Sequence, residues 1–171
     1  MPAKRSNKLD NKYKSIVLAY VNFCFDSTIA AQLLDEVDEC DVDFNNLNSE
    51  LLSLKIFLFD CLTCSFVGKN LKLQNKILNF FYNVLENRIK NIEDDLISDF
   101  NYLLDLRKKS YAGKIINWDI SDIGEKIAKK FVGILKVGND EYILNLIHEK
   151  INSICDKIAS AYERVDAKNN H

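Results

Sequence analysis

Helix-breaking residues are almost absent from this chain, and their scarcity constrains the fold more than any other feature. Only one proline and five glycines occur among 171 residues. A β-barrel or β-sandwich needs many tight turns, which proline and glycine usually supply. Apolar residues recur at helical spacing along the chain, and no strand-like alternation of useful length appears. These patterns predict an all-α fold.

The helical periodicity divides the chain into six or seven helices packed as a bundle. They are expected at about residues 9–25, 26–38, 49–67, 71–91, 92–109, 122–138 and 139–165. The helix at about 49–67 is apolar on nearly all sides, so we expect it to be the central, buried helix. Its apolar stretch is slightly short for a membrane span and contains Lys55 and Asp60.

Length and composition predict one folded domain over residues 1–171. A chain with 47% apolar residues and a net charge of -2 can bury a core and is not disordered. A short basic arm (1–8) and a polar tail (166–171) flank the helices. The N-terminus lacks the apolar stretch of a signal peptide, and five cysteines without paired spacing fit a reducing compartment. We therefore expect a cytoplasmic protein without membrane association.

No arrangement of residues typical of a catalytic site is recognisable in the sequence. Cys61 and Cys64 form a CxxC, but it lies within the apolar helix, where burial raises the pKa of a thiol. We interpret the pair as core-filling, with a redox or metal role as the alternative. His148 is the only histidine besides the C-terminal residue, and its place beside an apolar stripe is typical of a structural imidazole.

The acidic linker 39–50 also fails as a cation site. It joins two helices, but Phe44 occupies the position where a calcium loop needs glycine. The motifs of nucleotide-binding loops, nucleophile elbows and zinc proteases are absent from the sequence. We expect no catalytic activity, no cofactor and no metal.

Charge is distributed unevenly along the chain. Residues 26–60 hold nine acids and one lysine, a net of -8, whereas residues 107–136 hold eight bases and three acids, a net of +5. The simplest interpretation is that the two segments face each other or face solvent. A surface that steers a charged partner or pairs two copies is the alternative. The basic segment, with Tyr111 and Trp118 interleaved, also makes nucleic-acid binding a weaker alternative, opposed by a pI near 5.7.

The last helix carries a heptad seam. Apolar residues step alternately by three and four residues through Leu144, Ile147, Ile151, Ile154, Ile158, Ala161 and Val165. Such a seam usually packs against a neighbouring helix of the same bundle. The alternative is a helix from a second copy.

Five asparagines recur at every fourth position of the helix 71–91. Because a four-residue step drifts by about 40°, they spread over one broad polar face opposite the apolar residues. We interpret them as a solvated face. Phe80 interrupts this face and is a candidate contact for a partner.

These observations predict a helical protein that acts by protein–protein contact, including self-association as a homodimer, rather than by catalysis. The expected contact residues are Phe80, Leu144, Ile151, Ile158, Lys108, Lys109, Lys126 and Lys129. The alternatives are a nucleic-acid-associated protein using residues 107–136 and a carrier of an apolar ligand. The carrier would hold its ligand in a cavity between Phe57, Phe59, Phe80 and Phe81.

Overall fold

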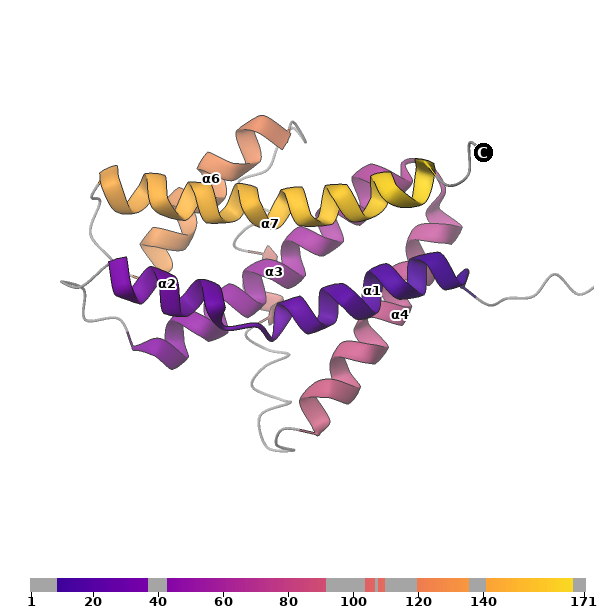
Figure 1. Cartoon of the computed structure of the whole chain (residues 1–171), viewed down its shortest axis with the longest axis horizontal. Coiled ribbons are helices and arrows are strands. Elements are labelled where there is room, and N and C mark those ends of the chain that lie inside the picture. The colour runs from indigo at the N-terminus through magenta and orange to yellow at the C-terminus, as the bar shows by residue number, and fades with distance from the viewer. Residues whose placement is uncertain are drawn as a thin grey trace, which may run out of the picture.

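Six helices make up the described part of the chain. The computed structural model describes residues 9–36, 43–91, 104–106, 108–109, 120–135 and 141–167. The helices are α1 (Asn11–Cys24), α2 (Thr28–Glu36), α3 (Phe44–Val67), α4 (Leu71–Lys90), α6 (Ile120–Leu135) and α7 (Glu141–Ala167) (Figure 1). These residues contain no strand, so the predicted all-α bundle is confirmed.

The centre of the bundle is α3, as its apolar composition predicted. It contacts each of the other five helices, and its inward residues Leu54, Leu58 and Phe59 are fully buried. Helices α1 and α7 run alongside each other across one face of the molecule, and α3 crosses behind them (Figure 1). The remaining helices α2, α4 and α6 pack around this core.

The first turn of α3 corrects the predicted linker. The helix begins at Phe44 instead of near Ser49, because the Asp43 carboxylate accepts a hydrogen bond from the backbone N–H of Asn46 at 3.0 Å. Residues assigned to a loop therefore form a capped helix start. The preceding linker residues 39–42 lie outside the described residues.

Several other predictions fall outside the described residues. Of the helix expected at 92–109, only 104–106 and 108–109 are described, and both pieces are helical. The arm 1–8 and the loop 110–119 are not described. Helix α7 continues to Ala167, and residues 168–171 of the predicted polar tail lie outside the described residues.

The α3–α4 corner depends on the backbone of Gly68. Its φ of 59° and ψ of -135° lie in a region that side chains with a Cβ rarely adopt. The Gly68 N–H still donates to the Cys64 carbonyl at 3.1 Å, and the helix ends here because the positive φ turns the chain away. The buried Gln74 amide then donates to the carbonyls of Cys64 and Gly68, at 3.2 and 2.5 Å, and holds α4 against the corner.

We expect Gly68→Ala to lower the free energy of unfolding by about 1–3 kcal/mol, the usual range for such backbone strain. The matched control is Gly133→Ala in α6, where an added Cβ meets no atom within 4 Å. That substitution should raise the free energy of unfolding by about 0.5–1 kcal/mol, because alanine is the better helix former. Urea denaturation of both variants measures the two effects. Equal effects at the two glycines would contradict the role given to Gly68.

The asparagine face of α4 lies in solvent, as predicted. All five asparagines (Asn75, Asn79, Asn83, Asn87 and Asn91) are exposed. The opposite side of the helix is buried through Ile77, Phe81 and Leu85. Phe80 is half-buried and packs against the core, so its own chain covers part of the ring.

The heptad seam of α7 lies inside the bundle. Ile151, Ile154 and Ile158 are at most 1% exposed, and α7 packs against α6, α3 and α1. Leu144 is half-buried and also packs against the core. The fold thus corrects the alternative in which Ile151 and Ile158 contact a partner, because their side chains are already covered by this chain.

Helices α1 and α2 together form an apolar stretch, Asn11–Glu36, that could cross a membrane by length and composition alone. Core helices of soluble proteins meet the same criterion, and 39% of its most apolar window is buried in the fold. The stretch therefore does not indicate where the protein resides.

Candidate functional site on helices α1, α2 and α7

Stacked aromatic rings form a rigid floor beneath α1 and α7. The Phe59 ring stacks on Tyr20 with centroids 4.8 Å apart and contacts Phe81 at 4.3 Å. The Tyr20 hydroxyl donates to the Lys55 carbonyl at 2.9 Å and fixes α1 on α3. Because these rings are buried and mutually packed, the floor has a defined shape.

A buried lysine closes the end of α1. The Lys55 side chain leaves α3, is only 1% exposed, and donates to the carbonyls of Phe23 at 3.1 Å, Cys24 at 3.5 Å and Asp26 at 2.7 Å. The carbonyls of Phe23 and Cys24 lie in the last turn of α1, at the negative end of its dipole, which favours a cation there. Burial lowers the pKa of Lys55, because removal from water penalises the ammonium ion.

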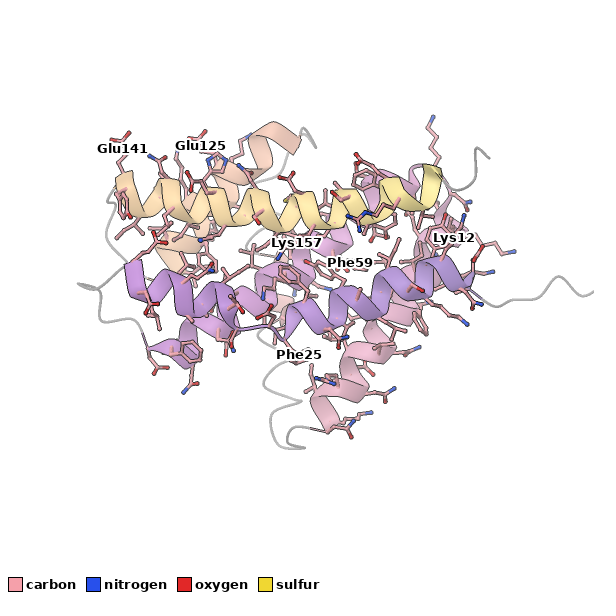
Figure 2. All side chains as sticks on the ribbon, viewed as in Figure 1. Lys12, Phe25, Phe59, Glu125, Glu141 and Lys157 are labelled. Atoms are coloured by element: carbon pink, nitrogen blue, oxygen red, sulfur yellow. The ribbon has the colours of Figure 1, made fainter. Side chains whose placement is uncertain are left out.

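A second lysine contacts the same part of α1 from α7. The Lys157 ammonium lies 4.2 Å from the centroid of the Phe23 ring, and the Lys55 ammonium lies 4.7 Å from it. In Figure 2, Lys157 and Phe59 lie in the space between α7 and α1. Two ammonium groups thus contact one aromatic ring, each attracted by its π-electrons.

An open groove runs between α7 and the α1–α2 pair, and we call it the α1–α7 groove. Its apolar part has a volume of about 200 Å³ and is lined by Ile16, Ala19, Tyr20, Phe23, Phe59 and Ile158, with Lys157 and Ala161 at its edge. Its polar part, about 350 Å³, is lined by the start of α2 and by Glu149, Lys150 and Ser153 of α7. Phe23 and Lys157 line both parts, so the two adjoin.

The outward surface of α7 borders this groove, and we call it the α7 face. A shallow hollow of about 570 Å³ lies along it, lined by Glu149, Asn152, Ser153, Asp156, Lys157, Ser160, Ala161 and Arg164. The hollow shares Lys157 and Ala161 with the apolar part of the groove. An apolar floor and a charged helix surface therefore adjoin on one side of the molecule.

A separate polar cluster joins α3 to the basic segment 107–136. The Asp60 carboxylate accepts a hydrogen bond from the Tyr82 hydroxyl at 2.5 Å and pairs with the Lys108 ammonium at 2.9 Å. Burial, and next the Asp60 charge, raise the pKa of Tyr82. Lys108, proposed as a partner contact, is instead half-buried within this cluster. The acidic segment 26–60 and the basic segment 107–136 were expected to face each other or to face solvent, and the Asp60–Lys108 pair brings them together here.

The other predicted contact lysines lie on the surface. Lys109, Lys126 and Lys129 are exposed, and Lys129 pairs with Glu125 one helical turn away on α6. Tyr111 and Trp118, the aromatic residues of the nucleic-acid alternative, lie outside the described residues.

The two cysteines of the CxxC have different surroundings. Cys61 is buried, and burial raises its pKa, as expected for a thiol that fills the core. Cys64 is exposed, which corrects the expectation that both thiols are buried. Within the described residues, no three histidine, cysteine or acidic side chains are grouped so as to hold a metal ion.

The predicted ligand cavity between phenylalanines is largely filled by the rings themselves. Phe57, Phe59 and Phe81 are at most 4% exposed, and Phe59 packs directly on Phe81. Among the cavities of the described residues, the apolar part of the α1–α7 groove contacts one of the four rings, Phe59.

The sequence patterns did not predict the groove, although they include some of the residues that form it. Ile16 and Tyr20 lie on the buried side of α1, but their position beside α7 depends on how two distant helices pack. The charges of the α7 face do repeat at heptad spacing in the sequence. No known protein family, curated protein or solved structure matches this chain.

Proposed function

We propose that this protein acts by protein–protein contact through the α7 face and the α1–α7 groove, without chemistry of its own. The observation that carries the proposal is the apolar part of the α1–α7 groove, about 200 Å³ over the buried Tyr20, Phe59 and Ile158, beside the charged and exposed surface of α7. Protein interfaces combine an apolar centre with a polar rim, and grooves between helices commonly receive a helix of a partner.

The dimensions of the surface support a macromolecular partner. The apolar part of the groove, about 200 Å³, is smaller than the roughly 300–1,000 Å³ of typical small-molecule pockets, and the larger hollows beside it, about 350 and 570 Å³, lack the mainly apolar lining of such pockets. Helix α7 has 27 residues, which corresponds to about 40 Å along the surface. A long shallow surface of this kind suits an elongated protein element better than a small ligand.

The thiols support a cytoplasmic location for this activity. The four described cysteines, Cys24, Cys61, Cys64 and Cys155, are all free. Unpaired thiols are usual in reducing compartments.

Photo-crosslinking tests the proposed function. A benzophenone amino acid replaces Ser160 on the α7 face in one variant and Asn83 on the exposed face of α4 in the matched control. After irradiation in extract from the native source, we expect adducts of higher mass from position 160 and none above background from position 83. Equal labelling at both positions, or no adduct at position 160, would contradict the proposal.

A further inference from the structure

Two charged stripes run along the exposed side of α7. The acidic stripe consists of Glu149, Asp156 and Glu163, and the basic stripe consists of Lys150, Lys157 and Arg164. Within each stripe the residues repeat every seven positions, so each stripe stays on one side of the helix. All six are exposed except Lys150, which is half-buried.

The spacing prevents these charges from neutralising one another within the helix. Neighbouring residues such as Asp156 and Lys157 point about 100° apart, and only residues three or four apart face each other. None of the six has an opposite charge three or four positions away. By contrast, Glu125 and Lys129 of α6 form such a pair. Within the described residues, no ion pair joins either stripe.

Small residues separate the two stripes. Ser153 lies four residues after Glu149 and four before Lys157, and Ser160 lies four residues after Asp156 and four before Arg164. Both serines are exposed and line the hollow of the α7 face. The distance between two packed helices depends on the side chains at the contact, so serines at its centre allow a close approach.

We infer, building on the proposed function, that the partner is a second copy of this chain and that the two α7 helices pack face to face and parallel. When a two-fold axis runs along parallel helices, the acidic stripe of each copy faces the basic stripe of the other. When the helices are antiparallel, the two-fold axis places each stripe opposite its own copy, and like charges meet. The charges thus select the parallel pair.

The parallel pair also places opposite charges at nearly the same position along the helix axis. Each acid directly precedes a base in the sequence. In the parallel pair it therefore lies only about 1.5 Å along the helix axis from that base of the other copy. Glu149 then faces Lys150, Asp156 faces Lys157 and Glu163 faces Arg164, on both sides of the two-fold axis. Present contacts leave the basic stripe available, because Lys150 bonds the neutral Gln32 amide and Lys157 contacts the Phe23 ring.

The first measurement is the mass of the full chain in solution. We expect a dimer at tens of micromolar in low salt and a monomer in about 1 M salt, where the Debye length is about 3 Å. Light scattering or sedimentation equilibrium reports this directly. A monomer at every salt concentration overturns the inference, and so does a dimer that salt does not weaken.

Charge exchange provides the sharpest test. One variant carries Lys150→Glu, Lys157→Glu and Arg164→Glu, and the other carries Glu149→Lys, Asp156→Lys and Glu163→Lys. Each variant alone should be monomeric, and their equimolar mixture should form a heterodimer. A control with Lys69→Glu, Lys72→Glu and Lys90→Glu, all exposed outside α7, should remain dimeric. Circular dichroism verifies that each variant folds, and a mixture that stays monomeric overturns the inference.

Disulfide trapping tests the orientation independently of the charges. In a chain with Cys40→Ser and Cys64→Ser, either Ser153→Cys or Ser160→Cys should form a covalent dimer on oxidation with diamide. In a parallel pair each position meets its own copy, within the short separation that a disulfide requires. Trapping only in a mixture of the two variants would show an antiparallel pair and overturn the inference.

These results separate the two proposals. If the chain stays monomeric but crosslinks another protein from position 160, the inference of a second copy is wrong and the proposed function stands. A chain that neither dimerises nor crosslinks fails both.

Discussion

Replacing Lys55 by methionine is expected to lower the free energy of unfolding by about 2–4 kcal/mol, although no charged partner is lost. Methionine retains most of the apolar stem but donates no hydrogen bond. The carbonyls of Phe23, Cys24 and Asp26 then lose the donor they share at the end of α1. Each buried acceptor left without a donor costs about 1–3 kcal/mol, reduced where water reaches it.

Urea or thermal denaturation measures this effect, and two variants make it specific. Lys55→Ala should be less stable still, because it also removes the buried stem and leaves a cavity. Lys72→Met, on the exposed side of α4, should change stability by no more than about 0.5 kcal/mol. A Lys55→Met variant as stable as the Lys72→Met control would mean that the ammonium group does not hold α1 and α2 together.

Replacing Phe59 by alanine is expected to lower the free energy of unfolding by about 3–5 kcal/mol. The ring is fully buried and contacts both Tyr20 and Phe81, so its removal leaves a cavity between α1, α3 and α4. It also deepens the apolar part of the α1–α7 groove, whose floor it forms. Chemical denaturation followed by circular dichroism measures the loss.

Phe80→Ala is the matched control for Phe59→Ala. Phe80 is also a phenylalanine, but it is half-buried on α4. Its removal should cost less, because part of the ring already contacts water and the space left can be hydrated. Equal losses at the two positions would show that Phe80 is packed as tightly as Phe59.

The two variants also separate stability from recognition. Lys55 and Phe59 lie beneath the surface, and their replacement should disturb the α1–α7 groove through the fold. The acidic stripe of α7 is exposed, whereas Lys150 and Lys157 of the basic stripe also contact Gln32 and Phe23. Reversal of the acidic stripe should change association while leaving the unfolding transition nearly unchanged, since each exposed substitution usually alters stability by less than about 0.5 kcal/mol.

The fold class and the faces of the helices could be predicted from the sequence because they depend on local spacing. The central position of α3 follows from its apolar surface, and the exposed asparagines of α4 follow from their drift around the helix. The interior place of the α7 seam was the preferred interpretation for the same reason. Local periodicity reports which side of a helix is buried, but not which helix covers it.

Individual side chains near element ends and surfaces were predicted less well. Asp43 begins α3 five residues earlier than expected, because the short side chain of this acid caps a helix as readily as it occupies a loop. Cys64 is exposed on a helix that is apolar nearly all round, because the apolar spacing of a helix does not show how far its neighbours extend along it. Lys108 was assigned to an open basic surface but packs against Asp60 and Tyr82.

The sequence by itself determined an all-α bundle, its central helix and the charges of α7, since these depend on residues within a few turns of one another. Tertiary structure alone decided that Lys55 closes the end of α1 and that α1, α2 and α7 enclose a groove over Phe59. Both arrangements join residues about 30 to 140 positions apart, as with Phe23 and Lys55, or Phe23 and Lys157. The physical reason is that helix packing, rather than helical periodicity, sets which distant surfaces meet.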